Sequence, residues 1–226
     1  MKNIAIAIDG PAAAGKSTVA KIVAKDLGFT YIDTGAMYRA FTWIVMEKGL
    51  DPENEEASCS IIPEVTISLE EDGRVICNGH DVTKAIREPR VSSKVSYIAS
   101  YPKIRLALVD MQRAMAKSKS VVMDGRDIGT YVLPDAEVKI FQIASVECRA
   151  KRRYEENVSK GIPTSYEDVV ADVEKRDYID SHRAFAPLKP AADSVELDTS
   201  PMSIMEVVKA IEEIVRQKTG LEVACR

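Results

Sequence analysis

Gly10-Pro11-Ala12-Ala13-Ala14-Gly15-Lys16-Ser17 gives the clearest indication of the fold of this 226-residue chain. It matches the eight-position phosphate-binding loop, in which two glycines, a lysine and a hydroxyl residue keep a fixed spacing. The apolar run 4–8 precedes it, and a helical pattern follows from Lys16 until Gly28 stops it. A strand, this loop and a helix together form a unit whose backbone N–H groups surround a phosphate. The sequence therefore predicts a phosphate site here.

The lysine and the serine of this loop have separate predicted roles. We expect Lys16 to reach the β- and γ-oxygens of a nucleoside triphosphate. We expect the Ser17 hydroxyl to be a ligand of Mg²⁺, which bridges the phosphates. A purely structural turn would explain the glycines, but neither the spacing of the lysine nor the hydroxyl after it.

Outside the loop, strands and helices alternate along the chain. Short apolar runs predict further strands at 29–32, 120–123, 138–143 and 195–197. Apolar residues at helical spacing predict a helix that Thr34 caps and that runs up to Gly49. Other helices are predicted at 91–98, 104–115, 146–160, 166–176 and 204–218. This order is typical of the α/β class, an open, mostly parallel sheet flanked by helices, with its ligand at the carboxyl ends of the strands.

A different pattern interrupts this alternation. Val65, Ile67 and Leu69 alternate with polar residues, Asp72-Gly73 forms a turn, the chain returns along 75–77, and Asn78-Gly79 forms a second turn. This predicts a small antiparallel sheet. Because α/β periodicity resumes afterwards, we expect one domain, 1–226, with its core at 1–60 and 100–226 and an insert at about 61–99.

The composition limits the classes of protein to consider. Hydrophobic residues make up 46% and charged residues 29% of the chain, and no apolar run approaches the roughly 20 residues of a membrane span. A net charge of −4 argues against nucleic acid as a partner. We expect a cytoplasmic monomer. The cysteines are scattered and are expected to be free thiols: Cys59, Cys77, Cys148 and Cys225.

Three classes of protein share such a loop: small-molecule kinases, GTPase switches and motor ATPases. The Asn-Lys-x-Asp base reader of a switch is absent, and the strand at 120–123 is followed by Asp124-Gly125-Arg126-Asp127 rather than the Asp-Glu typical of motors. A kinase with two anionic substrates needs several cations, because the two phosphate groups repel each other. Arginines after strands or near helix ends meet that need: Arg39, Arg126, Arg149, Arg152, Arg153, Arg176 and Arg183.

Nearly the whole sequence resembles the bacterial cytidylate kinase family. The motifs that carry the resemblance are Ile8-Asp9-Gly10-Pro11, Asp33-Thr34-Gly35-Ala36-Met37-Tyr38-Arg39, Asp124-Gly125-Arg126-Asp127-Ile128-Gly129 and the stretch from Arg176-Asp177 to Leu188. The resemblance implies an adenylate-kinase-like P-loop fold, an insert that binds the acceptor nucleotide, and a mobile helical lid at about 149–165. It also implies Mg²⁺-dependent transfer of the ATP γ-phosphate to CMP or dCMP, giving CDP or dCDP, in pyrimidine nucleotide metabolism.

The resemblance also implies roles for individual residues. The catalytic residues would be Lys16, Arg126, Arg176 and Arg183. The residues that bind ATP would be Gly10, Pro11, Ala12, Ala13, Ala14, Gly15, Lys16, Ser17, Thr18, Arg149 and Arg153, with Ser17 also on the metal. The residues that bind CMP would be Thr34, Tyr38, Arg39, Ser96, Arg105, Arg126, Asp127, Asp180 and Arg183.

Chemistry supports the base readers among these residues. Cytosine carries an exocyclic amine where uracil carries an oxygen, so the Asp127 carboxylate would accept a hydrogen bond from cytosine and repel uracil. Arg105 would donate to the acceptor atoms of the base.

Overall fold

A parallel five-stranded sheet forms the centre of the computed structural model, which describes residues 3–221. The strand order is β2-β6-β1-β7-β8, and every pair is parallel. The strands are β1 (Ala5–Asp9), β2 (Thr30–Asp33), β6 (Val121–Gly125), β7 (Val138–Ile143) and β8 (Val195–Asp198). The predicted α/β class and all five predicted strands are confirmed.

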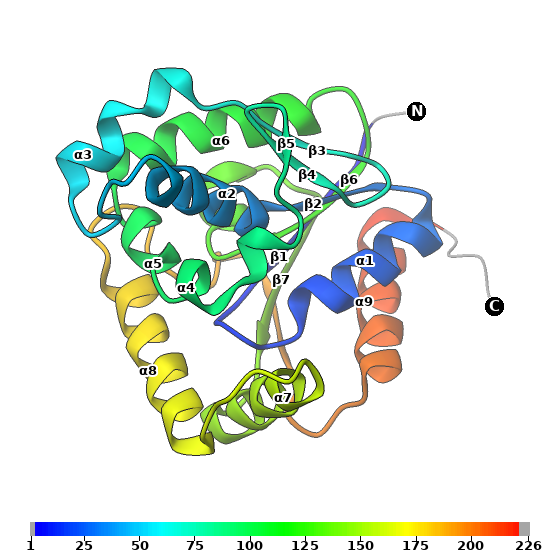
Figure 1. Ribbon diagram of the computed structural model, residues 1–226. Coiled ribbons are helices and arrows are strands. Elements are labelled where there is room, and N and C mark those ends of the chain that lie inside the picture. The colour runs from blue at the N-terminus through cyan, green and yellow to red at the C-terminus, as the bar shows by residue number, and fades with distance from the viewer. Residues whose placement is uncertain (1–2, 222–226) are drawn as a thin grey trace.

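Helices cover both faces of this sheet (Figure 1). The larger helices are α1 (Lys16–Leu27), α2 (Thr34–Glu47), α6 (Pro102–Ala116), α7 (Val146–Ser159), α8 (Tyr166–His182) and α9 (Ile204–Thr219). Ile6 and Ile8 of β1 belong to the apolar cluster with α1 and α9, whereas Ala7 belongs to the cluster with α6. Alternate side chains of one strand therefore face opposite layers, as a doubly covered strand requires.

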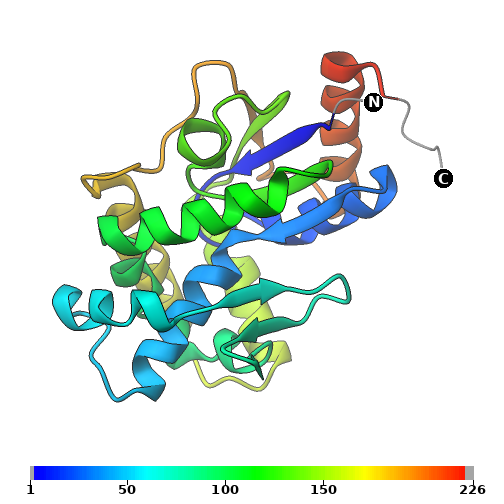
Figure 2. The same cartoon turned by 90° about the horizontal axis from the view of Figure 1, so that it is seen from above.

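A second, antiparallel sheet lies to one side of the first (Figure 2). It consists of β3 (Ile67–Leu69), β4 (Val75–Cys77) and β5 (His80–Asp81). Gly73 and Gly79 adopt positive φ of 88° and 80° at the two turns, the left-handed region that glycine tolerates best. The predicted antiparallel sheet is confirmed.

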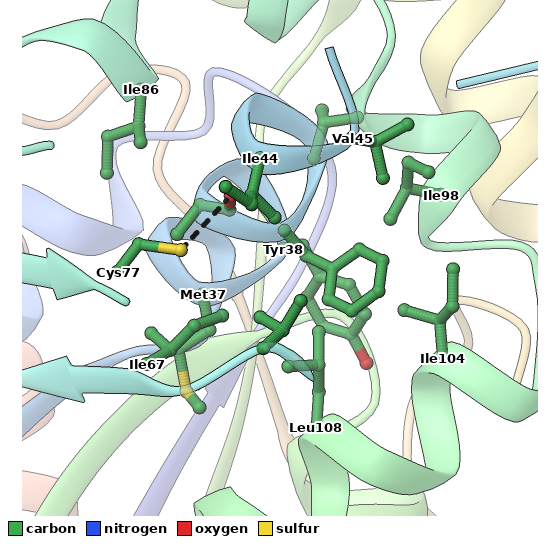
Figure 3. Close-up of a cluster of buried hydrophobic side chains, with 14 of the residues drawn as sticks. Met37, Tyr38, Ile44, Val45, Ile67, Cys77, Ile86, Ile98, Ile104 and Leu108 are labelled. Atoms are coloured by element: carbon green, nitrogen blue, oxygen red, sulfur yellow. Dashed lines mark hydrogen bonds between the residues drawn. The ribbon is translucent and has the colours of Figure 1, made fainter. Parts of the chain in front are cut away.

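An apolar cluster joins the second sheet to α2 and α6 (Figure 3). Ile67 and Cys77 come from the small sheet, Met37 from α2, and Ile104 and Leu108 from α6. All five are at most 8% exposed. The cluster therefore holds the insert firmly to the α2 and α6 layer.

Three helical predictions need correction. Asp33, not Thr34, caps α2, because its carboxylate accepts from the Ala36 N–H at 2.7 Å. The helix predicted at 91–98 is two short helices, α4 (Pro89–Ser92) and α5 (Val95–Ile98), in which Val91, Val95 and Ile98 are buried. α8 continues beyond Arg176 to His182, through a mostly polar stretch that carries no apolar period.

Four short helical elements were not predicted. They are α3 (Glu55–Ser60), the 3₁₀ turns Ile62–Glu64 and Ala85–Arg87, and a π-helical turn at Ile128–Val132.

Two further findings concern membrane spans and cysteines. Among residues 3–221, no helix has the length and apolar character needed to cross a bilayer. Cys59, Cys77 and Cys148 are free thiols, as predicted, and Cys225 lies outside the described residues.

Candidate active site

One cavity of about 650 Å³ connects the P-loop to the insert. Residues 13–18 of the P-loop line it, and so do Tyr38, Arg105 and Asp127. Nine lysines and arginines line the cavity against five aspartates and glutamates, although the chain as a whole is acidic. This local excess of positive charge suits a ligand with several phosphates.

The P-loop backbone is shaped by close packing against β7. A Cβ atom on Gly10 would lie 2.0 Å from the carbonyl oxygen of Gln142, so only glycine fits there. Ala13 and Gly15 adopt positive φ of 58° and 90° as the chain turns into α1. The Lys16 ammonium donates to the Pro11 carbonyl at 2.7 Å. Burial and the nearby Arg126 lower the pKa of Lys16, so a bound phosphate would restore the charge balance.

Asp124, at the end of β6, connects three of the elements that form the site. Its carboxylate accepts from the Ser17 hydroxyl at 2.8 Å and from the Tyr31 hydroxyl at 2.7 Å, while its backbone oxygen accepts from the Thr34 hydroxyl at 2.7 Å. Burial, with Asp33 close by, raises its pKa. Asp124 was not among the predicted site residues. An aspartate that directly ends a buried apolar run could have signalled it.

Asp127 lies between two arginines in the cavity lining. Arg105 donates to one carboxylate oxygen at 2.5 Å and Arg183 to the other at 3.3 Å. The Asp127 and Arg105 side chains are at most 5% exposed. The structure therefore brings the three predicted residues together. Ser96 is buried on α5 and does not line the cavity, although its neighbour Val95 does.

Arg126 and Arg176 differ in how they are paired. Arg126 donates to Asp180 at 2.8 Å. Although burial opposes it, Arg126 together with Arg176 and Arg183 holds the pKa of Asp180 below its usual value. Nε of Arg176 is buried and has no hydrogen-bond partner within residues 3–221, and burial lowers the pKa of this guanidinium to about 10. Arg176 therefore lines the cavity as a cation that a phosphate could pair with.

Asp33 pairs with two arginines from different parts of the chain. Arg39 of α2 lies 3.2 Å from its carboxylate and Arg87 of the insert 2.9 Å from it. Although burial opposes them, these arginines hold the pKa of Asp33 below its usual value. Arg87 lines the cavity but was not predicted as a site residue. Nothing in the sequence near Arg87 distinguishes it from an ordinary surface arginine.

The three arginines of α7 occupy different positions. Arg152 and Arg153 line the cavity, and Arg152 donates to the Ala14 carbonyl at 3.2 Å and the Thr199 carbonyl at 2.7 Å. Arg149 is 4% exposed and does not line the cavity. It donates to the Ala12 carbonyl at 3.0 Å and pairs with Asp177 at 2.6 Å. Arg149 thus stabilises the P-loop from outside the cavity. Its direct contact with ATP stays a prediction.

Asp9 anchors the turn that follows Asp127. Its carboxylate oxygens accept from the N–H groups of Ile128 and Gly129, each at 2.8 Å. Burial raises the pKa of Asp9 to about 6, against the opposing effect of these two donors. The π-helical turn at Ile128–Val132 therefore depends on a carboxylate whose charge is lost under mildly acidic conditions.

We expect activity to fall as the pH drops below about 6, because protonation of Asp9 removes an acceptor from the turn beside Arg126 and Asp127. Unfolding would not cause this fall. A carboxyl whose pKa is raised from 3.8 to about 6 on folding makes the fold more stable, not less, as the pH decreases through that window. The measurement is kcat against pH for the wild type and Asp9→Asn. In Asp9→Asn, kcat should be about tenfold lower than in the wild type at every pH and should no longer fall below about pH 6. A variant whose dependence of kcat on pH equals that of the wild type would contradict this role of Asp9.

Comparison with known proteins gives one consistent result. The family model described as cytidylate kinase matches residues 6–217. Cytidylate kinase of Oceanobacillus iheyensis is 53% identical over 222 residues, which cover 96% of each chain. That of Geobacillus sp. is 53% identical over 221 residues, covering 96% of this chain and 99% of the relative. That of Enterococcus faecalis is 51% identical over 221 residues, covering 96% and 98%.

Solved structures support the fold. An uncharacterized protein from Eubacterium ventriosum superposes with a TM-score of 0.55 at 14% identity, covering 96% of this chain and 99% of that one. A gluconokinase from Sinorhizobium meliloti gives 0.52 at 12% identity, covering 97% of each. Such distant likeness concerns the architecture alone. The match along residues 6–217 and the identity above one half, on a P-loop core with this cavity, show that the chain belongs to the cytidylate kinase family.

Proposed function

We propose that this protein transfers the γ-phosphate of ATP to CMP or dCMP, giving CDP or dCDP. The observation that carries the proposal is that Asp127, which lies between Arg105 and Arg183, lines the same cavity as the P-loop. The Asp127 carboxylate can accept a hydrogen bond from a base and the arginines can donate to it, while the P-loop offers phosphate-binding groups in the same cavity. The products would belong to pyrimidine nucleotide metabolism.

Phosphoryl transfer of this kind depends mainly on positioning and on neutralising charge. The N–H groups of the P-loop and Lys16 would hold the donor phosphates. Arg126, Arg176 and Arg153 line the same cavity and would neutralise the transferred group. No general base is required, because the phosphate oxygen of the acceptor is already an anion.

The acceptor phosphate would bind near the start of α2. Thr34, Tyr38, Arg39 and Arg183 line the cavity there. Asp180 would bond the ribose. Arg87, which comes from the insert, would join Arg39 at the acceptor phosphate once that anion competes with Asp33 for both guanidinium groups.

A Mg²⁺ ion fits the oxygen atoms beside the P-loop. The Ser17 hydroxyl and the Asp124 carboxylate lie 2.8 Å apart, and hydroxyl and carboxylate oxygens are ligands this ion prefers. Within residues 3–221, no cluster of three or more His, Cys, Asp or Glu residues could hold a metal, so phosphates and water would complete the shell. The ion would supply charge neutralisation and a bridge between phosphates.

A coupled assay of ADP release with CMP, dCMP, UMP and AMP, with and without Mg²⁺, tests the proposal. We expect CMP and dCMP to be turned over with kcat/KM about 100-fold or more above UMP and AMP, because the Asp127 carboxylate accepts from the cytosine amine and repels an oxygen. We expect removal of Mg²⁺ to abolish turnover. A preference for UMP or AMP would overturn the base assignment.

A further inference from the structure

A small group of buried polar side chains around Arg105 has incomplete hydrogen bonds. The Tyr38 hydroxyl, both amide atoms of Gln112 and Nε of Arg105 have no hydrogen-bond partner within residues 3–221. Gln112 is 0% and Arg105 1% exposed. A buried polar group without a partner costs free energy, so their presence together calls for an explanation.

These three side chains are neighbours in space. Arg105 and Gln112 are seven residues apart on α6 and therefore lie on the same face, two turns apart. The Arg105 guanidinium lies 5.3 Å from the centre of the Tyr38 ring. Tyr38 comes from α2, which packs on α6, and Figure 3 shows it in one cluster with Ile104 and Leu108 of that helix. Burial raises the pKa of Tyr38 to about 12, and an interaction of its hydroxyl with the Gln112 amide acts against that rise, although no hydrogen bond of normal geometry joins the two groups.

Arg105 is fixed on one side only. Its terminal nitrogens donate to Asp127 and to the Ala99 carbonyl. Its Nε makes no hydrogen bond to residues 3–221, and the side of the guanidinium toward Tyr38 faces the ring. The position of the Tyr38 ring therefore limits how far the guanidinium can move. A group that fixes the Tyr38 hydroxyl would fix the ring and, through it, Arg105.

We propose that Gln112 is a positioning residue for the acceptor nucleotide: its amide pairs with the Tyr38 hydroxyl when the acceptor binds, and so fixes Tyr38 and Arg105. This inference rests on the proposed function, in which Tyr38 and Arg105 contact CMP. Gln112 is absent from the cavity lining, so in this proposal it would act without touching the substrate. Without acceptor, the unpaired amide destabilises the protein; with acceptor, the new hydrogen bond stabilises the bound arrangement.

The variant Gln112→Met separates this role from a structural one, because methionine is similar in size and has no hydrogen-bonding group. We expect the melting temperature without ligand to rise by about 2–4 °C, since a buried unpaired amide is removed. We expect KM for CMP to rise about 5- to 10-fold, since one hydrogen bond is lost. KM for ATP should stay within about twofold, because the P-loop is remote.

Tyr38→Phe supplies the partner for a double-mutant cycle. In that background Gln112→Met should change KM for CMP by no more than about twofold, because the hydroxyl that it positions is absent. A lower melting temperature for Gln112→Met, an unchanged KM for CMP, or additive effects in the cycle would each overturn the inference.

Asp127→Asn distinguishes this outcome from failure of the proposed function. If the inference alone is wrong, Asp127→Asn still impairs the use of CMP while Gln112→Met does not. If the acceptor site itself is wrong, neither variant changes KM for CMP.

Discussion

Lys16→Ala is expected to reduce kcat by about a thousandfold or more. Lys16 starts α1 and lines the cavity, and its ammonium contacts the Pro11 carbonyl within the loop. In the proposed reaction it stabilises negative charge on the β- and γ-phosphates as the bond between them breaks. Water cannot replace it in a buried position, because the donor must already be oriented when the charge develops. Steady-state kinetics with ATP and CMP provide the measurement.

The fold should withstand this substitution. Burial lowers the pKa of Lys16, so removing it relieves a desolvated cation, and we expect no loss of thermal stability. Lys25→Ala is the matched control, since Lys25 lies in the last turn of the same helix and is exposed. Its kinetics should equal those of the wild type. Full turnover in Lys16→Ala would remove the lysine from the site.

Asp127→Asn is expected to have the second large effect, on the choice of acceptor. We expect the ratio of kcat/KM for CMP to that for UMP to fall about 10- to 100-fold. The neutral amide can turn its NH₂ toward the uracil oxygen, whereas the carboxylate can only accept and therefore repels that oxygen. The measurement is the same coupled assay with both acceptors, and KM for ATP should change by no more than about twofold.

Asparagine is preferable to alanine for this experiment. Asp127 lies between Arg105 and Arg183, which are both nearly inaccessible to solvent, and alanine would leave two buried cations without a partner. Asp110→Asn is the control for loss of one carboxylate, because Asp110 is exposed on α6. An unchanged ratio for CMP against UMP in Asp127→Asn, with the fold intact, would refute the role of Asp127 in reading the base.

Much of the fold could be predicted because its signals are local. The run 4–8, the glycine loop and the helix from Lys16 specify β1, the P-loop and α1 by apolar period, turn residues and spacing. Helix ends were less predictable where polar contacts define them. α8 extends past Arg176 through residues that include Asp180, which is buried because Arg126, far away in sequence, pairs with it.

The predicted site residues that the structure brings together lie in dense sequence motifs. Asp127 and Arg183 were named and do lie together. Arg87 and Gln112 were missed, because a single arginine or glutamine has no distinctive pattern around it. Ser96 and Arg149 were named, but the structure buries both outside the cavity lining.

The sequence by itself determined that a strand, a phosphate loop and a helix open an α/β fold, because these signals depend only on neighbouring residues. Which charged side chains pair with one another is evident only from the tertiary structure. Asp33 pairs with Arg87 from 54 positions away, and Gln112 faces Tyr38 across two helices. Pairings at such separation depend on how the layers pack, since burial strengthens each charge interaction and packing chooses its partner.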